Sequence, residues 1–205
     1  ELAAAKTVKI KNAKVGTKVT VGDYTYRITT LTPKKKTVEV TGFTKKAKKK
    51  CGEVMIPASI KIASKTGKYK GTYSFKVTSV GKKAFYNNKR IWEITLGNNI
   101  RTVKKQAFYG CSNLGSLIFY DADKLKVLEA GAFQNCKNLW YTNLDKQNLM
   151  IKKIGKNALK NSGIKDNPYF IKTRKKPKTI DNNQMIITES YEDGGEKIGG
   201  LDNMG

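Results

Sequence analysis

The sequence predicts a short, mainly β repeat solenoid of the α/β repeat type, capped at its N-terminal end by antiparallel β-hairpins. Three observations predict this fold. An aliphatic residue four positions before an alanine, with Phe or Leu directly after that alanine, recurs four times. Short extended segments follow the copies of this motif at equivalent offsets. Segments rich in Val, Ile, Thr and Tyr, separated by Gly, Lys and Pro, precede the copies.

The N-terminal third is predicted to form the cap. Residues 1–16 are expected to be an extended segment and residues 17–78 a β-hairpin cap. Strand-like segments lie at 19–21, 24–30, 37–42, 54–57, 60–63 and 69–77. Gly22-Asp23 and Thr66-Gly67 are typical hairpin turns. A cap is expected because a bare terminal repeat would expose its apolar core.

Residues 79–171 are predicted to form the solenoid. Successive copies of the motif lie 23, 25 and 26 residues apart, within the roughly 20–29 residues of leucine-rich repeats. One copy cannot bury its apolar face alone, so the coils should stack with their alanines one above another. The predicted repeat core is Val80, Ala84, Phe85, Val103, Ala107, Phe108, Leu128, Ala132, Phe133, Ile154, Ala158 and Leu159.

The extended segments of the coils, at 91–96, 114–119 and 139–144, should present a ligand face. Alternate residues of a strand point to opposite sides, so the residues between the apolar positions point outward. Exposed aromatic side chains suit a protein or glycan ligand, although the two tryptophans could instead pack at the edge of the layers. The ligand-face candidates are Trp92, Glu93, Thr95, Ser116, Ile118, Tyr120, Trp140, Tyr141 and Asn143.

These motifs resemble the BspA-type leucine-rich repeats of surface and secreted proteins from gut bacteria, clostridia-like species among them, and from some protozoa. The resemblance is carried by Val-Thr-Ser-Val-Gly-Lys-Lys-Ala-Phe (77–85), Ala-Phe-Tyr-Gly-Cys-Ser-Asn-Leu (107–114) and Met-Ile-Pro-Ala-Ser-Ile (55–60). It implies a right-handed solenoid, an extracellular or cell-surface location, adhesion-like binding and no catalytic residues. Leu159 replaces the usual phenylalanine, and Thr142 interrupts an inward position.

The charge is strongly positive and unevenly distributed. The chain has 41 Lys and Arg against 16 Asp and Glu, a net charge of +25. Residues 172–205 are expected to be a basic and then acidic tail, since six of the acids follow residue 180. Such a field attracts polyanions weakly and keeps monomers apart. Expected partners are therefore an unknown protein, a glycan or an anionic cell-wall polymer, bound by a monomer.

A basic protein that binds nucleic acid is the alternative function. The runs Lys34–Lys36, Lys45–Lys46 and Lys48–Lys50 could form a nucleic-acid or heparin-like patch. They could equally be solvated turn residues between hairpins. Lysine greatly outnumbers arginine, which is the residue that reads bases and phosphates with two hydrogen bonds. No nucleic-acid-binding motif is present in the sequence.

Catalysis has little support, and we expect no catalytic, cofactor or metal residues. The chain has no histidine, which excludes Ser–His and Cys–His nucleophile pairs. Cys111 and Cys136 should stack in adjacent coils, either as a redox or metal pair or as small buried residues. Cys51 could be a reactive thiol beside lysines. The carboxylates that could pair for glycoside hydrolysis are Asp121, Asp123, Glu129 and Asp145.

The location is expected to be extracellular or at the cell surface. No apolar run approaches the roughly 18 residues needed to span a bilayer, so we expect no membrane span. The chain starts at Glu1 without methionine. This start is expected of a secreted protein after removal of its signal peptide, and equally of a shortened chain.

Overall fold

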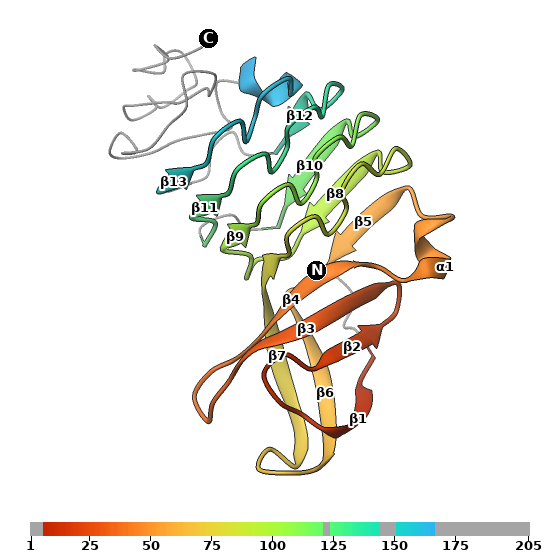
Figure 1. Cartoon of the computed structure of the whole chain (residues 1–205), viewed down its shortest axis with the longest axis vertical. Helices are drawn as coiled ribbons and strands as arrows, with labels where there is room; N and C mark the ends of the chain where they lie inside the picture. The colour runs from red at the N-terminus through yellow and green to blue at the C-terminus, as the bar shows by residue number, and fades with distance from the viewer. Residues whose placement is uncertain (1–5, 121–123, 144–150, 167–205) are drawn as a thin grey trace.

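The computed structural model describes residues 6–120, 124–143 and 151–166. Two β-sheets enclose one apolar core, and successive coils stack above the N-terminal strands (Figure 1). A nine-stranded sheet follows the order β13-β11-β9-β7-β4-β3-β2, with β6 and β1 attached to it through β7. A four-stranded sheet has the order β12-β10-β8-β5. The predicted mainly β solenoid with N-terminal hairpins is therefore confirmed.

Six of the seven strands of the N-terminal region match the predicted segments closely, whereas the first, Val8–Asn12, lies in the segment that was predicted only to be extended. Gly22 and Gly67 occupy the turns that join β2 to β3 and β6 to β7, both with positive φ. The elements are β1 (Val8–Asn12), β2 (Lys18–Val21), β3 (Tyr24–Leu31), β4 (Lys36–Phe43), α1 (Lys45–Lys48), β5 (Glu53–Ile56), β6 (Ser59–Thr66) and β7 (Gly71–Val80).

Each later coil contributes one short strand to each sheet. The four-stranded sheet receives β8 (Glu93–Leu96), β10 (Ser116–Phe119) and β12 (Tyr141–Thr142). The nine-stranded sheet receives β9 (Thr102–Val103), β11 (Val127–Leu128) and β13 (Lys153–Ile154). A short 3-10 helix at Gly163–Asp166 ends the described part of the chain. All strand pairs between successive coils are parallel.

The alanines of the repeat stack one above another. The backbone amide after each alanine donates to the carbonyl of the alanine in the next coil. These hydrogen bonds run from Phe85 to Ala107, from Phe108 to Ala132 and from Phe133 to Ala158, with N···O distances of 2.8, 2.9 and 2.8 Å. Eleven of the twelve predicted core residues are buried, and Ala84 is half-buried beneath the cap.

The phenylalanines form a ladder through the core. Phe108 lies between Phe85 and Phe133, with ring centroids 5.3 Å from each and the planes within 11° of parallel. Below them, Phe43 meets Phe85 edge-on at 5.0 Å. The buried Leu159 follows at the other end. This column of rings, which burial and dispersion stabilise, joins every coil to its neighbours.

Two residues in each coil turn have left-handed backbone conformations. One directly precedes the stacked alanine, and the other comes four residues later. Glycine, asparagine, lysine and glutamine occupy these positions: Lys83 and Asn87, Gln106 and Gly110, Gly131 and Asn135, and Asn157 and Asn161. Asparagine and glycine tolerate this conformation best, which explains the frequency of these residue types in the repeat.

The prediction that the cap consists of antiparallel hairpins is only partly correct. The pairs β2–β3, β3–β4 and β6–β7 are antiparallel, but β1–β6 and β4–β7 are parallel. Strand β5 lies outside the cap sheet and pairs in parallel with β8, in the sheet of the solenoid. Strands β4 and β5 thus form a first coil in which Gly42-Phe43 replaces Ala-Phe. A Cβ at Gly42 would lie 2.6 Å from the Ala84 carbonyl oxygen, so only glycine fits.

A buried carboxylate joins the cap to the solenoid. Glu39 in β4 pairs with Arg27 in β3 at 2.7 Å and with Lys104 after β9 at 2.5 Å. The Ser79 hydroxyl donates to the same carboxylate at 3.0 Å. Burial alone would raise the pKa of Glu39, but Lys104, Ser79 and Arg27 outweigh it and hold that pKa below its usual value.

Several predicted features lie outside the described residues. They are the last residues of the predicted solenoid (167–171), the predicted tail (172–205) and the last residue of the extended segment 139–144.

Candidate functional site

The outer surface of the four-stranded sheet carries the predicted ligand face. Parallel pairing aligns its residues in rows, because each coil repeats the same register. Ile94, Leu96 and Leu117 are fully buried on the inner side, so their strand neighbours point outward. The outward residues form two adjacent rows. The first row is Glu53, Glu93, Ser116 and Tyr141, and the second is Met55, Thr95 and Ile118.

Four aromatic side chains are exposed on or beside this surface. Trp140 is 69% exposed, Trp92 50%, Tyr120 49% and Tyr141 44%. Trp140 and Tyr141 meet edge-on, with ring centroids 5.8 Å apart. Large exposed apolar groups gathered on one face mark interaction sites. Of the two alternatives for the tryptophans, the structure favours exposure on the face over packing at the edge.

Glycine and tryptophan alternate from coil to coil at the position just before each strand of the four-stranded sheet. The backbone amides of Trp92, Gly115 and Trp140 donate to the carbonyls of Gly52, Trp92 and Gly115, respectively. A Cβ on Gly52 would lie 2.7 Å from the Trp92 ring, so that ring covers Gly52. At Gly115 a Cβ would meet only two carbonyl oxygens, at 3.8 and 3.9 Å. The surface between the two tryptophans is therefore open.

Two of the ligand-face candidates have no free side chain to offer. Thr95 is only 6% exposed, because it lies in the row between the larger Met55 and Ile118. Asn143 uses its amide to hold the backbone of Phe119, accepting from its N–H at 2.9 Å and donating to its carbonyl at 2.7 Å. Thr95 and Asn143 are therefore structural residues, while Glu93, Ser116 and Ile118 are half-buried.

Met55 belongs to this face and was missing from the prediction. It is 48% exposed and lies beside Thr95. A signal was present in the sequence, because Glu53-Val-Met-Ile repeats the pattern of Glu93-Ile-Thr-Leu. Assigning this segment to the cap concealed the match.

The face is chemically distinct from the rest of this basic chain. Its four strands contain no lysine or arginine, whereas Glu53 and Glu93 are direct neighbours in it. Aromatic surfaces with a few hydrogen-bonding groups can contact both the apolar faces of sugar rings and protein side chains. The arrangement suits recognition of a ligand of low charge.

The environments of the three cysteines favour structural roles over reactive ones. The Cys111 thiol donates to the Phe85 carbonyl at 3.2 Å, and the Cys136 thiol donates to the Phe108 carbonyl at 3.1 Å. Burial raises the pKa of Cys111 to about 12 and raises that of Cys136 well above its usual value. Both thiols therefore stay protonated, as expected of small core residues. At Cys51 burial and the nearby Asp23 raise the thiol pKa, so it is not an activated nucleophile.

The carboxylates considered for glycoside hydrolysis form no site among the described residues. Glu129 accepts a hydrogen bond from the Lys105 backbone amide at 3.0 Å, which fixes a turn. Asp121, Asp123 and Asp145 lie outside the described residues. In the ranges that the structure covers, no three His, Cys, Asp or Glu side chains converge to hold a metal. No helix in those ranges is long and apolar enough to cross a bilayer.

Comparison with solved structures finds the same fold in bacterial proteins. A leucine rich cell surface protein from Faecalibacterium prausnitzii A2-165 is 21% identical, with a TM-score of 0.53, covering 71% of this chain and 34% of that chain. A leucine-rich repeat protein from Bacteroides ovatus ATCC 8483 is 25% identical, with a TM-score of 0.51, covering 70% and 33%. The chain thus spans about a third of the length of these two structures.

A third structure, a leucine-rich repeat protein from Bacteroides capillosus ATCC 29799, is 24% identical, with a TM-score of 0.46, covering 60% of this chain and 78% of that chain. No curated protein matches the chain. The family model described as the BspA type leucine rich repeat region (6 copies) matches residues 68–184, more than half of the sequence. The chain therefore belongs to the BspA-type leucine-rich-repeat family.

Proposed function

We propose that the protein is a non-enzymatic, extracellular or cell-surface binding module of the adhesion type. Its aromatic face contacts a protein or a glycan of low charge. We use this name for the surface formed by the four aromatic residues Trp92, Tyr120, Trp140 and Tyr141 together with the neighbouring Met55. The observation that carries the proposal is the exposure of all five side chains on or beside one sheet. The surface description of the Faecalibacterium protein supports the location. The high net charge favours a monomer.

Binding to arrays of glycans and of host matrix proteins tests this proposal. For any partner found, Trp140→Ala should weaken binding about tenfold, the effect of losing roughly 1.4 kcal/mol at a hot-spot aromatic. Folding should be unchanged because the ring is mostly exposed. Tyr86→Ala is the matched control, since Tyr86 is also exposed but stacks on Tyr109, away from this sheet. Equal loss in both variants, or no partner on either array, would refute the proposal.

A further inference from the structure

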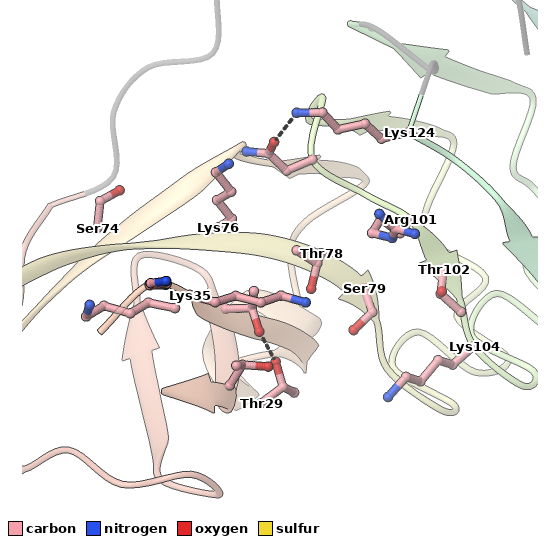
Figure 2. Close-up of a pocket in the computed structure, with 15 residues that line it drawn as sticks. Thr29, Lys35, Ser74, Lys76, Thr78, Ser79, Arg101, Thr102, Lys104 and Lys124 are labelled. Carbon is pink, nitrogen blue, oxygen red and sulfur yellow. Dashed lines mark hydrogen bonds between the residues drawn. The ribbon is translucent and has the colours of Figure 1, made fainter. Parts of the chain in front are cut away.

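A concave surface lies on the other sheet, where the cap meets the solenoid. It is a cleft of about 770 Å³, within the roughly 300–1,000 Å³ of typical ligand sites. Figure 2 shows the side chains around it, with Lys35 from the β3–β4 connection, Lys76 from β7 and Arg101 from the segment before β9. Lys124 comes from the next coil. Residues far apart in the sequence therefore converge on this cleft.

The lining is basic and rich in hydroxyl groups. It has seven lysines or arginines, seven serines or threonines and one asparagine. Among the described residues that line the cleft there is no acid and no aromatic ring. Lysine ammonium groups and hydroxyls together suit tetrahedral oxyanions, which need charge and several hydrogen bonds. Sites for single-stranded nucleic acid, by contrast, combine a cationic groove with aromatic side chains on which the bases stack.

Three of the lysines that line the cleft already have partners within the protein. Lys104 pairs with Glu39, and Lys124 donates to the Asn99 side chain at 3.0 Å. Lys36 donates to two carbonyls of its own loop and lies over the Tyr73 ring. The contacts of these three lysines hold the walls of the cleft in place.

The other four cations that line the cleft are not paired with any described residue. In the described part of the chain, no side-chain hydrogen bond or ion pair is made by Lys34, Lys35, Lys76 or Arg101. All four are exposed. Like charges that converge in a concavity repel one another and create a strong local field. An anion that enters the cleft relieves this repulsion.

The cleft has a rigid floor. Ser74, Lys76 and Thr78 alternate along β7 and face the cleft, while Phe75 and Val77 between them are buried. Strand β7 pairs with β6, β4 and β9, so it is fixed on both sides. On the cap side the Thr29 and Thr37 hydroxyls hydrogen-bond to each other at 2.7 Å. Because the backbone of this floor is already ordered, binding an anion here costs less ordering than binding it on a mobile loop.

We propose that this cleft binds a linear glycan that carries sulfate or phosphate esters. The cationic cleft is separate from the aromatic face, since it lies on the other sheet, and its ligand chemistry is different. Lysine ammonium groups contact the ester oxyanions, and the serine and threonine hydroxyls hydrogen-bond to ester and sugar oxygens. The protein therefore has two binding surfaces, one for a ligand of low charge and one for an anionic glycan.

Calorimetric titration of the full chain at about 0.15 M salt tests this proposal. The probes are a size-defined sulfated oligosaccharide derived from heparin, its desulfated form, a phosphorylated oligosaccharide of similar length and duplex DNA. We expect saturable binding at one site, with the desulfated probe inactive. Tighter binding of the sulfated probe identifies sulfate esters as the source, and tighter binding of the phosphorylated probe identifies phosphate esters. Failure of both, or equal binding of duplex DNA, would overturn the proposal.

A matched pair of variants separates the site from the net charge. The triple variant Lys35→Ala, Lys76→Ala and Arg101→Ala should lose at least tenfold in affinity. The control, with Lys45, Lys46 and Lys48 of α1 changed to alanine, removes the same charge from another exposed surface, and it should lose less than about twofold. Equal losses of affinity would show that only the overall positive field attracts the probe, which would refute a specific binding site in the cleft.

Lysine footprinting of the wild-type protein keeps the test valid if the cleft variant fails to fold. Acetylation of Lys35 and Lys76 should slow when the probe is bound, whereas Lys45 and Lys46 should react at an unchanged rate. Uniform protection of all four lysines would overturn the proposal.

Discussion

The two sheets of the solenoid share their interior but differ on their outer surfaces. Each coil sends one strand to each sheet, so the same alanine and phenylalanine columns support both. One surface presents tryptophans and carries no lysine or arginine on its strands. The other presents a lysine-rich cleft without aromatic rings in its described lining. The repeat therefore fixes the interior and leaves each outer face free to carry its own chemistry.

The largest effect is expected in the shared interior. Phe108→Ala removes a fully buried ring from the middle of the ladder, and should lower the free energy of unfolding by about 3–5 kcal/mol. Both surfaces should lose binding, because both depend on this column. Urea unfolding measures the change. Tyr86→Ala, at a half-exposed turn position, should cost less than about 1 kcal/mol. A loss below about 2 kcal/mol for Phe108→Ala would contradict the shared core.

The second largest loss of stability is expected at the junction of cap and solenoid, and it should affect binding only at the cationic cleft. Glu39→Gln breaks the ion pairs between the cap and the solenoid. We expect a loss of about 2 kcal/mol, less than for a fully buried pair because Arg27 and Lys104 are partly exposed. Binding of the sulfated probe should change with it, while the aromatic face should keep its affinity. Equal effects on both surfaces would contradict their independence.

The same residue predicts a pH dependence. The pKa of Glu39 is below its usual value near 4.5 in the folded protein. Its contribution to stability is therefore complete above that pH and is lost as the pH falls through the folded pKa. The difference in unfolding free energy between wild type and Glu39→Gln should shrink as the pH is lowered below about 4.5. A difference that stays constant down to pH 3 would argue against the ion pairs.

A smaller change, which stabilises the protein, is expected in the sheet that carries the aromatic face. The Thr142 hydroxyl is buried in β12 and has no hydrogen-bond partner among the residues that the structure describes. Thr142→Val keeps the shape and removes the unpaired group, so it should stabilise the protein by about 1 kcal/mol. Thr20→Val makes the same change at an exposed strand position and should be nearly neutral. Thermal unfolding of both variants tests the prediction, and destabilisation by Thr142→Val would contradict it.

Changes in stability of at most this size are expected at the coil turns, away from both surfaces. Gln106 has a φ of 55°, in the left-handed region that favours glycine. Gln106→Gly should stabilise the fold by about 0.5 kcal/mol, and Gly131→Ala at the equivalent position of the next coil should destabilise it by about 1 kcal/mol. Neither change should affect binding. Effects of the same sign in both variants would contradict the repeated turn geometry.

Sequence periodicity predicted the interior because stacking imposes it in every coil. The spacing of Ala107 and Ala132 was sufficient to place them one above the other, as the structure confirms. The first coil was not predicted. Gly42 stands where the repeat has alanine, and the β6–β7 hairpin separates β5 from the next coil. The exposure of Trp92 also depends on Gly52, which is distant in sequence.

The cationic cleft could be predicted only in part. Lys34–Lys36 is visible as a run, but so is Lys48–Lys50, and the sequence does not distinguish them. The structure does, because it brings the first run near Lys76 and Arg101, while the second lies at and after the end of α1. A site built from three distant segments has no local signature.

Tryptophan emission, recorded while each partner is added, is the most direct test of two independent surfaces. Trp92 and Trp140 are the only tryptophans of the chain, and both are exposed on the aromatic face. A partner of that face should shift their emission to shorter wavelength and shield them from a soluble quencher. The sulfated oligosaccharide should bind with unchanged emission. A shift caused by the sulfated probe, or an aromatic-face partner that binds without one, would contradict the account.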